Sequence, residues 1–144
     1  MVAVREARPE DAEAVLALMA GLGRPAIAPD ADPQGNVFLD HLGHPDAVVF
    51  VAELQGGVVG AASLWFRPRL NWTTLEAWIP DLYVDPAHRR RRAARALLDA
   101  CAAAARGRGC HRLVLESGHE RAAAHQLYEA YGFIHGGRFY ALPL

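Results

Sequence analysis

Two spacings of hydrophobic residues divide the chain into expected strands and helices. Apolar runs at 47–53 and 58–66, separated by Gln55-Gly56-Gly57, predict a hairpin, and a third strand is expected over 75–84. Residues 93–106 repeat apolar side chains at helical spacing instead and are followed by two glycines. The centre of the chain is therefore expected to fold as three strands followed by a helix.

Shorter elements flank this centre. The pattern predicts strands at 2–4, 113–115, 133–134 and 139–142, and helices at 9–20, 37–42 and 121–131. The resulting order is β-α-α-β-β-β-α-β-α-β-β. Hairpins need antiparallel neighbours, and the central strand–helix–strand unit needs a parallel pair. We therefore expect an α/β (α+β) fold with a mixed, mostly antiparallel central sheet and helices on both faces.

Composition indicates one globular domain over residues 1–144. The chain is 52% hydrophobic and 22% charged, as globular proteins are. No apolar run approaches the roughly 18 residues that span a bilayer, and the N-terminus lacks the apolar segment of a signal peptide. Cys101 and Cys110 fit neither a metal-ligand spacing nor a disulfide framework. We expect a cytoplasmic protein with reduced thiols and no membrane partner.

Residues 81–98 point to an anion site. An apolar strand ends at Asp85-Pro86, four consecutive arginines follow at 89–92, and an alanine-rich helix begins. Free N–H groups and the positive end of the helix dipole favour an anion at such a junction, and arginines add charge-assisted hydrogen bonds. The charge is also unevenly distributed, because residues 1–80 carry −5 and residues 81–144 carry +4. A phosphate group is the expected ligand.

Two other classes of ligand are not expected. The basic patch is short, the chain has a net charge of −1, and no nucleic-acid recognition motif is present. His119-Glu120 with His125 does not have the spacing of a zinc-binding His-Glu-x-x-His helix. We expect neither a nucleic-acid partner nor a metal.

Two motifs carry a resemblance to a known family. Leu82-Tyr83-Val84-Asp85-Pro86 with its arginine loop, and Leu127-Tyr128-Glu129-Ala130-Tyr131-Gly132-Phe133, resemble the GNAT superfamily of N-acetyltransferases, and the resemblance covers essentially the whole chain. It implies a GNAT-like fold and acetyl-CoA as co-substrate. It also implies acetyl transfer to a primary amine of a small molecule or peptide, by a monomer or homodimer.

The resemblance assigns the acetyl-CoA site. The family's loop pattern Arg/Gln-x-x-Gly-x-Gly/Ala falls on Arg89, Arg92 and Ala94, so arginine stands at position 92 where glycine is expected. Arg90 replaces another common glycine. The backbone of one strand is expected to bind pantetheine and the loop to bind pyrophosphate. The implied residues are Leu82, Tyr83 and Val84 on the strand, and Arg89, Arg90, Arg91, Arg92, Ala93, Ala94 and Arg95 in the loop and helix start.

Two backbone features qualify this assignment. If Arg92 needs a positive φ, its side chain costs about 1–2 kcal/mol. Good helix propensity over Arg92-Ala93-Ala94-Arg95 predicts instead that Arg92 already belongs to the helix, where arginine costs little. Pro80 cannot donate to a strand ladder, so the strand bulges there, forms an edge or gives way to a loop. With the family resemblance added, we expect the bulge.

The catalytic candidates are Tyr128, Glu76 and Asp81. Tyr128 matches the family tyrosine that protonates the leaving thiolate, and a tyrosine with a pKa near 10 stays protonated beside a thiol near 8.5. Glu76 and Asp81 are both candidates for binding or deprotonating the amine, on opposite faces of the strand unless the bulge resets the register. Trp65, Trp72 and Trp78, with the loop 67–69 and the segment 23–36, are expected to frame the acceptor site. The alternatives are a catalytically inactive GNAT-like acyl-CoA or anion-binding domain and, with less support, a nucleic-acid-binding protein.

Overall fold

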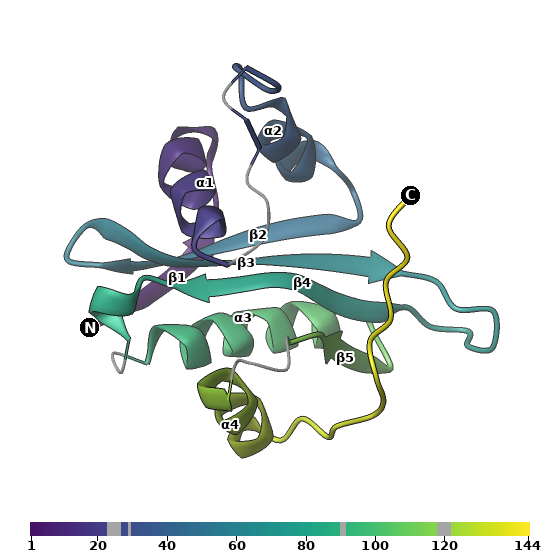
Figure 1. Ribbon diagram of the computed structural model, residues 1–144. Coiled ribbons are helices and arrows are strands. Elements are labelled where there is room, and N and C mark those ends of the chain that lie inside the picture. The colour runs from purple at the N-terminus through teal and green to yellow at the C-terminus, as the bar shows by residue number, and fades with distance from the viewer. Residues whose placement is uncertain (23–26, 29, 90–91, 118–121) are drawn as a thin grey trace. The chain divides into compact units, whose positions relative to one another are not determined.

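Five strands form one sheet in the order β1-β2-β3-β4-β5, with helices on both faces (Figure 1). The computed structural model describes residues 1–22, 27–28, 30–89, 92–117 and 122–144. The strands are β1 (Ala3–Glu6), β2 (Ala47–Leu54), β3 (Gly57–Arg67), β4 (Glu76–Val84) and β5 (Arg112–Leu115). The helices are α1 (Ala12–Ala20), α2 (Asn36–Gly43), α3 (Ala93–Gly107) and α4 (Ala122–Tyr131), with single 3-10 turns η1 (Pro9–Asp11) and η2 (Pro86–His88).

The sheet has the mixed topology that the sequence predicts. β1, β2, β3 and β4 pair antiparallel in chain order. Helix α3 connects β4 to β5, and the His111 N–H donates to the Leu75 carbonyl at 3.0 Å. β5 therefore begins beside the start of β4, as a parallel crossover through α3 requires.

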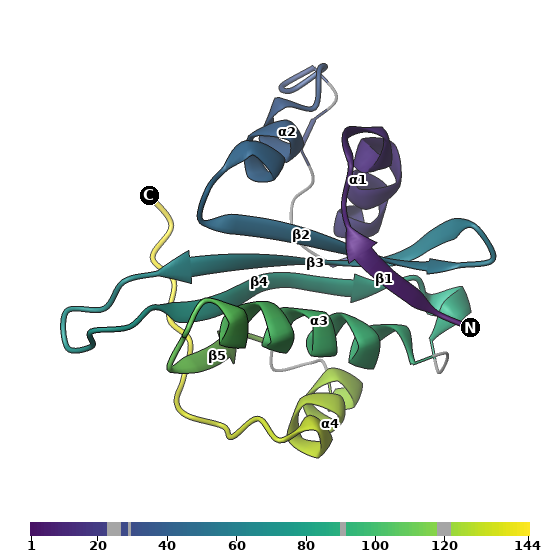
Figure 2. The same cartoon turned by 180° about the vertical axis from the view of Figure 1, so that it is seen from behind.

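Two apolar layers enclose this sheet. Figure 1 and Figure 2 show α1 and α2 on one face and α3 on the other. Val15 and Leu18 of α1 and Phe38 of α2 pack with Val49 and Val51 of β2 on the first face. On the second face, α3 packs on β3 and β4 through the fully buried side chains of its inner face, Leu97, Leu98 and Cys101. The sheet is thus buried on both sides along its central strands.

The expected bulge lies in β4 at Pro80. Ser63 of β3 pairs with Asp81, but Trp65 pairs with Trp78, so one β3 residue faces the two β4 residues Ile79 and Pro80. The extra residue changes the alternation of side chains along β4. Because Arg67 pairs with Glu76 and alternation along β3 is regular, Glu76 and Asp81 lie on the same face of the sheet.

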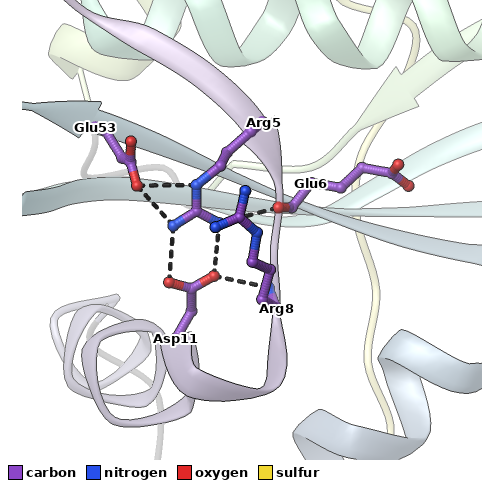
Figure 3. A network of polar contacts seen from close by, with 5 residues as sticks. All are labelled: Arg5, Glu6, Arg8, Asp11 and Glu53. Carbon is purple, nitrogen blue, oxygen red and sulfur yellow. Dashed lines mark hydrogen bonds and ion pairs between the residues drawn. The ribbon is translucent and has the colours of Figure 1, made fainter. Parts of the chain in front are cut away.

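A partly buried cluster of ion pairs connects β1 to the start of α1 (Figure 3). The Arg5 guanidinium donates to both oxygens of Asp11, at 2.8 and 3.0 Å, and to Glu53 Oε1 at 2.6 and 2.8 Å. The Arg8 N–H also donates to Asp11. The hydrogen bonds from Arg5 lower the pKa of the buried Asp11 carboxyl, so the carboxylate is ionised and orients the start of α1.

The backbone divides into two compact units, Met1–Val114 and Leu115–Leu144. In the second unit, α4 ends at Tyr131, and the Gly132 and Phe133 N–H groups donate to the Tyr128 carbonyl. The expected strands at 133–134 and 139–142 are wrong, because residues 132–144 contain no strand. A strand needs a partner for its backbone groups, and the described residues 122–144 contain a helix and no strand to pair with. The prediction of a single domain over 1–144 stays a prediction.

Candidate active site

A cavity of about 320 Å³ lies between the sheet and the two N-terminal helices. Most of its wall is apolar and comes from α1, α2 and the residues Leu22, Ile27 and Ala28. The polar side chains that reach it are Asp32, His41, Ser63 and Asp81. Of the expected acceptor-site residues, the structure therefore places Asp81 and part of the segment 23–36 at one cavity.

Asp81 reaches this cavity because of the bulge. Its carboxylate Oδ2 accepts a hydrogen bond from the Ser63 hydroxyl at 2.7 Å, across the β3–β4 pair. Ser63 is itself buried. The hydroxyl fixes the orientation of the carboxylate at the sheet end of the cavity. Sequence reasoning missed Ser63, because its contact with Asp81 depends on strand register.

Glu76 lies on the same face but in a different environment. Its side chain has 0% exposure and lies outside the cavity wall. Oε2 accepts from Arg67 Nε at 2.7 Å, and Oε1 accepts from Arg112 Nε at 2.7 Å and from Arg69 Nη1 at 3.2 Å. Burial raises the Glu76 pKa, but the hydrogen bonds from Arg67 and Arg112 outweigh it and hold the pKa at about 2. A carboxylate with three guanidinium partners is a poor base, so this environment favours a structural role.

The second half of β4 has backbone N–H and carbonyl groups along the edge that does not pair with β3. The Asp85 N–H donates to the Val59 carbonyl at 2.8 Å. By alternation, the backbone groups of Tyr83 also point toward β3, and those of Leu82 and Val84 point away from it. β5 has four residues and begins beside the start of β4, so the paired part of this edge is short. Leu82 and Val84 thus present polar backbone where the resemblance expects pantetheine.

Tyr83 has a side-chain environment that the sequence did not predict. Its ring packs against Gly21 at the end of α1, where an added Cβ would lie 2.5 Å from ring atoms. The Arg89 guanidinium lies over the same ring, 5.5 Å from its centroid. Tyr83 therefore connects the end of α1 to the first residue of the arginine loop. Gly21 is needed there for close approach.

The loop ends in a strained residue. Arg92 has φ 63° and ψ 15°, the left-handed region, and its carbonyl accepts the first hydrogen bond of α3, from the Ala96 N–H at 3.0 Å. The prediction that Arg92 belongs to the helix is therefore wrong. Helix propensity describes residues inside a helix, whereas Arg92 is the N-cap, where the chain turns sharply into α3. Arginine thus occupies a conformation that favours glycine.

The other predicted residues fall in three places. Ala93, Ala94 and Arg95 form the first turn of α3, and their N–H groups precede the first intrahelical donor. Arg90 and Arg91 lie outside the described residues. Tyr128 lies in the second compact unit, is 6% exposed and meets the Phe133 ring edge-on at 6.0 Å.

The three tryptophans expected to frame the acceptor site do not line this cavity. None of Trp65, Trp72 and Trp78 is among the described residues that line the cavity. Trp65 contacts the rings of His41 and His44, Trp72 stacks on His111 at 4.0 Å, and the Arg67 guanidinium covers the Trp78 ring at 4.5 Å. Trp65 therefore contacts the wall residue His41 from outside the wall, the other two rings have partners that do not line the cavity, and Arg67 and Arg69 bind Glu76.

Comparisons with known proteins agree with this geometry. The sequence model of the acetyltransferase (GNAT) family matches residues 15–133, and the chain belongs to this family. A putative acetyltransferase from Agrobacterium tumefaciens is 27% identical, with 99% of each chain covered and a TM-score of 0.86. A comparison with curated proteins returned no significant match.

Two further solved structures, each under 25% identical, share the fold. A ribosomal-protein-alanine N-acetyltransferase from Brucella melitensis is 22% identical, with 100% of this chain and 99% of that chain covered and a TM-score of 0.80. The structure of AAC(6')-Iy in complex with a bisubstrate analogue of CoA and acetylneamine is 20% identical, with the same coverage and a TM-score of 0.83. Among the described residues, no helix is long and apolar enough to cross a membrane.

Proposed function

We propose that the protein transfers an acetyl group from acetyl-CoA to a primary amine. The observation that carries the proposal is the bulged β4, which has Asp81 in a cavity on one face and outward backbone groups at Leu82 and Val84 just before the N-terminus of α3. This arrangement offers adjacent sites for an amine and for a long thioester with a phosphate end. Membership of the GNAT family supports the same reading.

The acetyl-CoA site would use three parts of the chain. The outward backbone of Leu82 and Val84 would bind the amides of pantetheine. The N–H groups of Ala93, Ala94 and Arg95 would bind pyrophosphate at the positive end of α3, with arginine side chains of the loop adding charge. AAC(6')-Iy, which has this fold, is known in complex with a CoA bisubstrate analogue.

The reaction forms one bond, breaks one, removes two protons from the nitrogen and delivers one proton to the sulfur. Asp81 holds the substrate ammonium and accepts its proton directly or through water. The amine nitrogen then bonds to the acetyl carbonyl carbon, the carbon–sulfur bond breaks, and the nitrogen releases its second proton to solvent. The thiolate takes a proton from Tyr128, the proposed acid, which is restored from solvent. The products are an acetamide, CoA and one net proton.

The first experiment measures thermal unfolding with acetyl-CoA. A ligand at 100 times its dissociation constant stabilises a protein by about 2.7 kcal/mol, so a clear rise in Tm is expected. Tripolyphosphate and 0.5 M salt are the controls for a generic anion site. No shift at millimolar acetyl-CoA, or an equal shift with tripolyphosphate, contradicts the proposal.

The second experiment compares Tyr128→Phe with Tyr131→Phe on the same helix. Mass spectrometry of the acetylated amine avoids interference from Cys101 and Cys110 in thiol-based assays. Tyr128→Phe is expected to lower kcat by about 100-fold or more while acetyl-CoA binding changes little, because only the acid is lost. Equal losses of kcat and binding would show that Tyr128 serves only in packing.

One observation favours a second candidate, an inactive GNAT-like domain that binds acyl-CoA. Arg92 occupies the left-handed N-cap of α3, the position at which the family uses glycine. An acetyl-CoA-dependent rise in Tm without transfer to any amine would support this candidate.

A further inference from the structure

We propose that the acceptor is a primary amine on a compact apolar body that carries no anionic group. The inference rests on the proposed acetyl transfer and narrows its substrate class. It comes from the shape and chemistry of the 320 Å³ cavity beside Asp81.

The cavity suits a small apolar group. Val15, Leu16 and Met19 of α1, Ile27, and Phe38 of α2 form most of the wall opposite the sheet. Its volume is near the lower end of the range for ligand sites. A polyhydroxylated sugar would place hydroxyl groups against these side chains without hydrogen-bond partners, which is unfavourable.

The polar side chains on the helix side of the cavity are hydrogen-bonded to the backbone of α2. Asp32 caps α2, with its oxygens accepting from the Asn36 and Val37 N–H groups at 2.8 and 3.0 Å. His41 Nδ1 bonds to the Val37 carbonyl at 2.8 Å, and its ring meets Trp65 edge-on. Asp81, oriented by Ser63, is therefore the group that a substrate ammonium would meet.

The charge of the wall selects against anions. Asp32 and Asp81 are both acidic, no arginine occurs among the described residues of the wall, and the chain has no lysine. A substrate carboxylate or phosphate would meet no arginine among the described wall residues and would face two carboxylates, which is costly. Free amino acids and sugar phosphates are thereby disfavoured, and alkyl or arylalkyl amines are favoured.

The test compares amines that differ by one feature. Phenethylamine and phenylalanine differ by a carboxylate, as do hexylamine and 6-aminohexanoate. In each pair, we expect kcat/KM to be at least tenfold higher for the amine that lacks the carboxylate. From propylamine to hexylamine, kcat/KM should rise by up to about fourfold for each methylene that the cavity buries, the equivalent of about 0.8 kcal/mol. The inference is overturned if kcat/KM is higher for phenylalanine than for phenethylamine, for 6-aminohexanoate than for hexylamine, or for neamine than for either amine that lacks the carboxylate.

A matched pair of variants locates the selectivity in the cavity. Leu16 lines the cavity and is 37% exposed, whereas Leu39 is 39% exposed and lies outside the wall. Leu16→Arg should reduce the ratio of kcat/KM for hexylamine to kcat/KM for 6-aminohexanoate by at least tenfold, because the new arginine supplies a cation for the carboxylate. Leu39→Arg should leave the ratio unchanged. Equal effects of both variants contradict the inference.

A binding measurement separates this inference from the proposed function. Phenethylamine alone should raise the Tm of the protein more than phenylalanine does at equal concentration. If acetyl-CoA binds and polar amines are acetylated best, the inference fails and the acetyltransferase stands. If acetyl-CoA neither binds nor supports transfer, the acetyltransferase fails, and equal shifts with the two amines then also overturn the inference.

Discussion

The two ends of β4 carry the same kind of side chain on the same face and use it in opposite ways. At the first end, Glu76 is enclosed by Arg67, Arg69 and Arg112. Toward the other end, Asp81 has a serine hydroxyl beside it and an open cavity in front of it. A carboxylate whose charge is neutralised by guanidinium groups contributes to the fold, whereas one that faces a cavity is placed to meet a ligand.

Asp81→Asn is the strongest test of this difference. Removing the charge removes both the attraction for ammonium and the proton acceptor, so kcat/KM for a primary amine should fall by about 100-fold or more. Asp40→Asn, at an exposed position of α2 outside the cavity wall, is the matched control. The measurement is steady-state acetylation by mass spectrometry. Full activity of Asp81→Asn would show that Asp81 is not the base.

Glu76→Gln should affect stability more than catalysis. The amide cannot neutralise the arginines, and we expect a loss of about 2 kcal/mol in the free energy of unfolding, because the arginine side chains are 38–54% exposed and water screens part of the interaction. Urea unfolding measures this loss, with the exposed Glu129→Gln as control. A stable variant with a 100-fold lower kcat would reverse the roles assigned to Glu76 and Asp81.

Because of the Glu76 carboxylate, we expect the stability of the protein to fall in acid. Its pKa is held at about 2 in the folded protein, below the ordinary value of 4.5. A group with a depressed pKa stabilises the fold above its unfolded pKa, and this stability is lost as pH falls. The free energy of unfolding should therefore decline from about pH 5 toward pH 2, and Glu76→Gln should make this decline shallower. An unchanged slope in the variant would contradict the assignment.

The smallest expected effect lies beyond the other end of β4, at Arg92. Arg92→Gly should raise the free energy of unfolding by about 1 kcal/mol, because glycine adopts φ 63° without the side-chain clash. Ala96→Gly in the same helix should lower it by about 0.5–1 kcal/mol. Urea unfolding compares the two. Destabilisation by both variants would mean that the Arg92 side chain contributes more than its backbone strain costs.

The sequence predicted the features that depend on residues close to one another in the chain. The three long strands and α3 lie close to their expected bounds. Pro80 indicated an irregularity because proline removes a donor from the ladder, and the family resemblance favoured the bulge that the structure has. What the sequence could not supply depends on distant partners. Arg112 reaches Glu76 across 36 positions, and Ser63 reaches Asp81 across 18. At Arg92, local propensity gave the wrong answer because the turn geometry overrides it.

The extra residue at Ile79–Pro80 also affects how sequences of relatives should be aligned. Glu76 and Asp81 are separated by an odd number of positions yet share a face, so counting in twos from the start of β4 misses the cavity carboxylate. A homologue whose strand lacks the insertion would present the equivalent acid one position earlier. Deleting one residue here would restore regular alternation along β4 and leave Asp81 on the cavity face, an even number of positions from Glu76. An alignment gap within this short stretch therefore changes which residue is compared with Asp81.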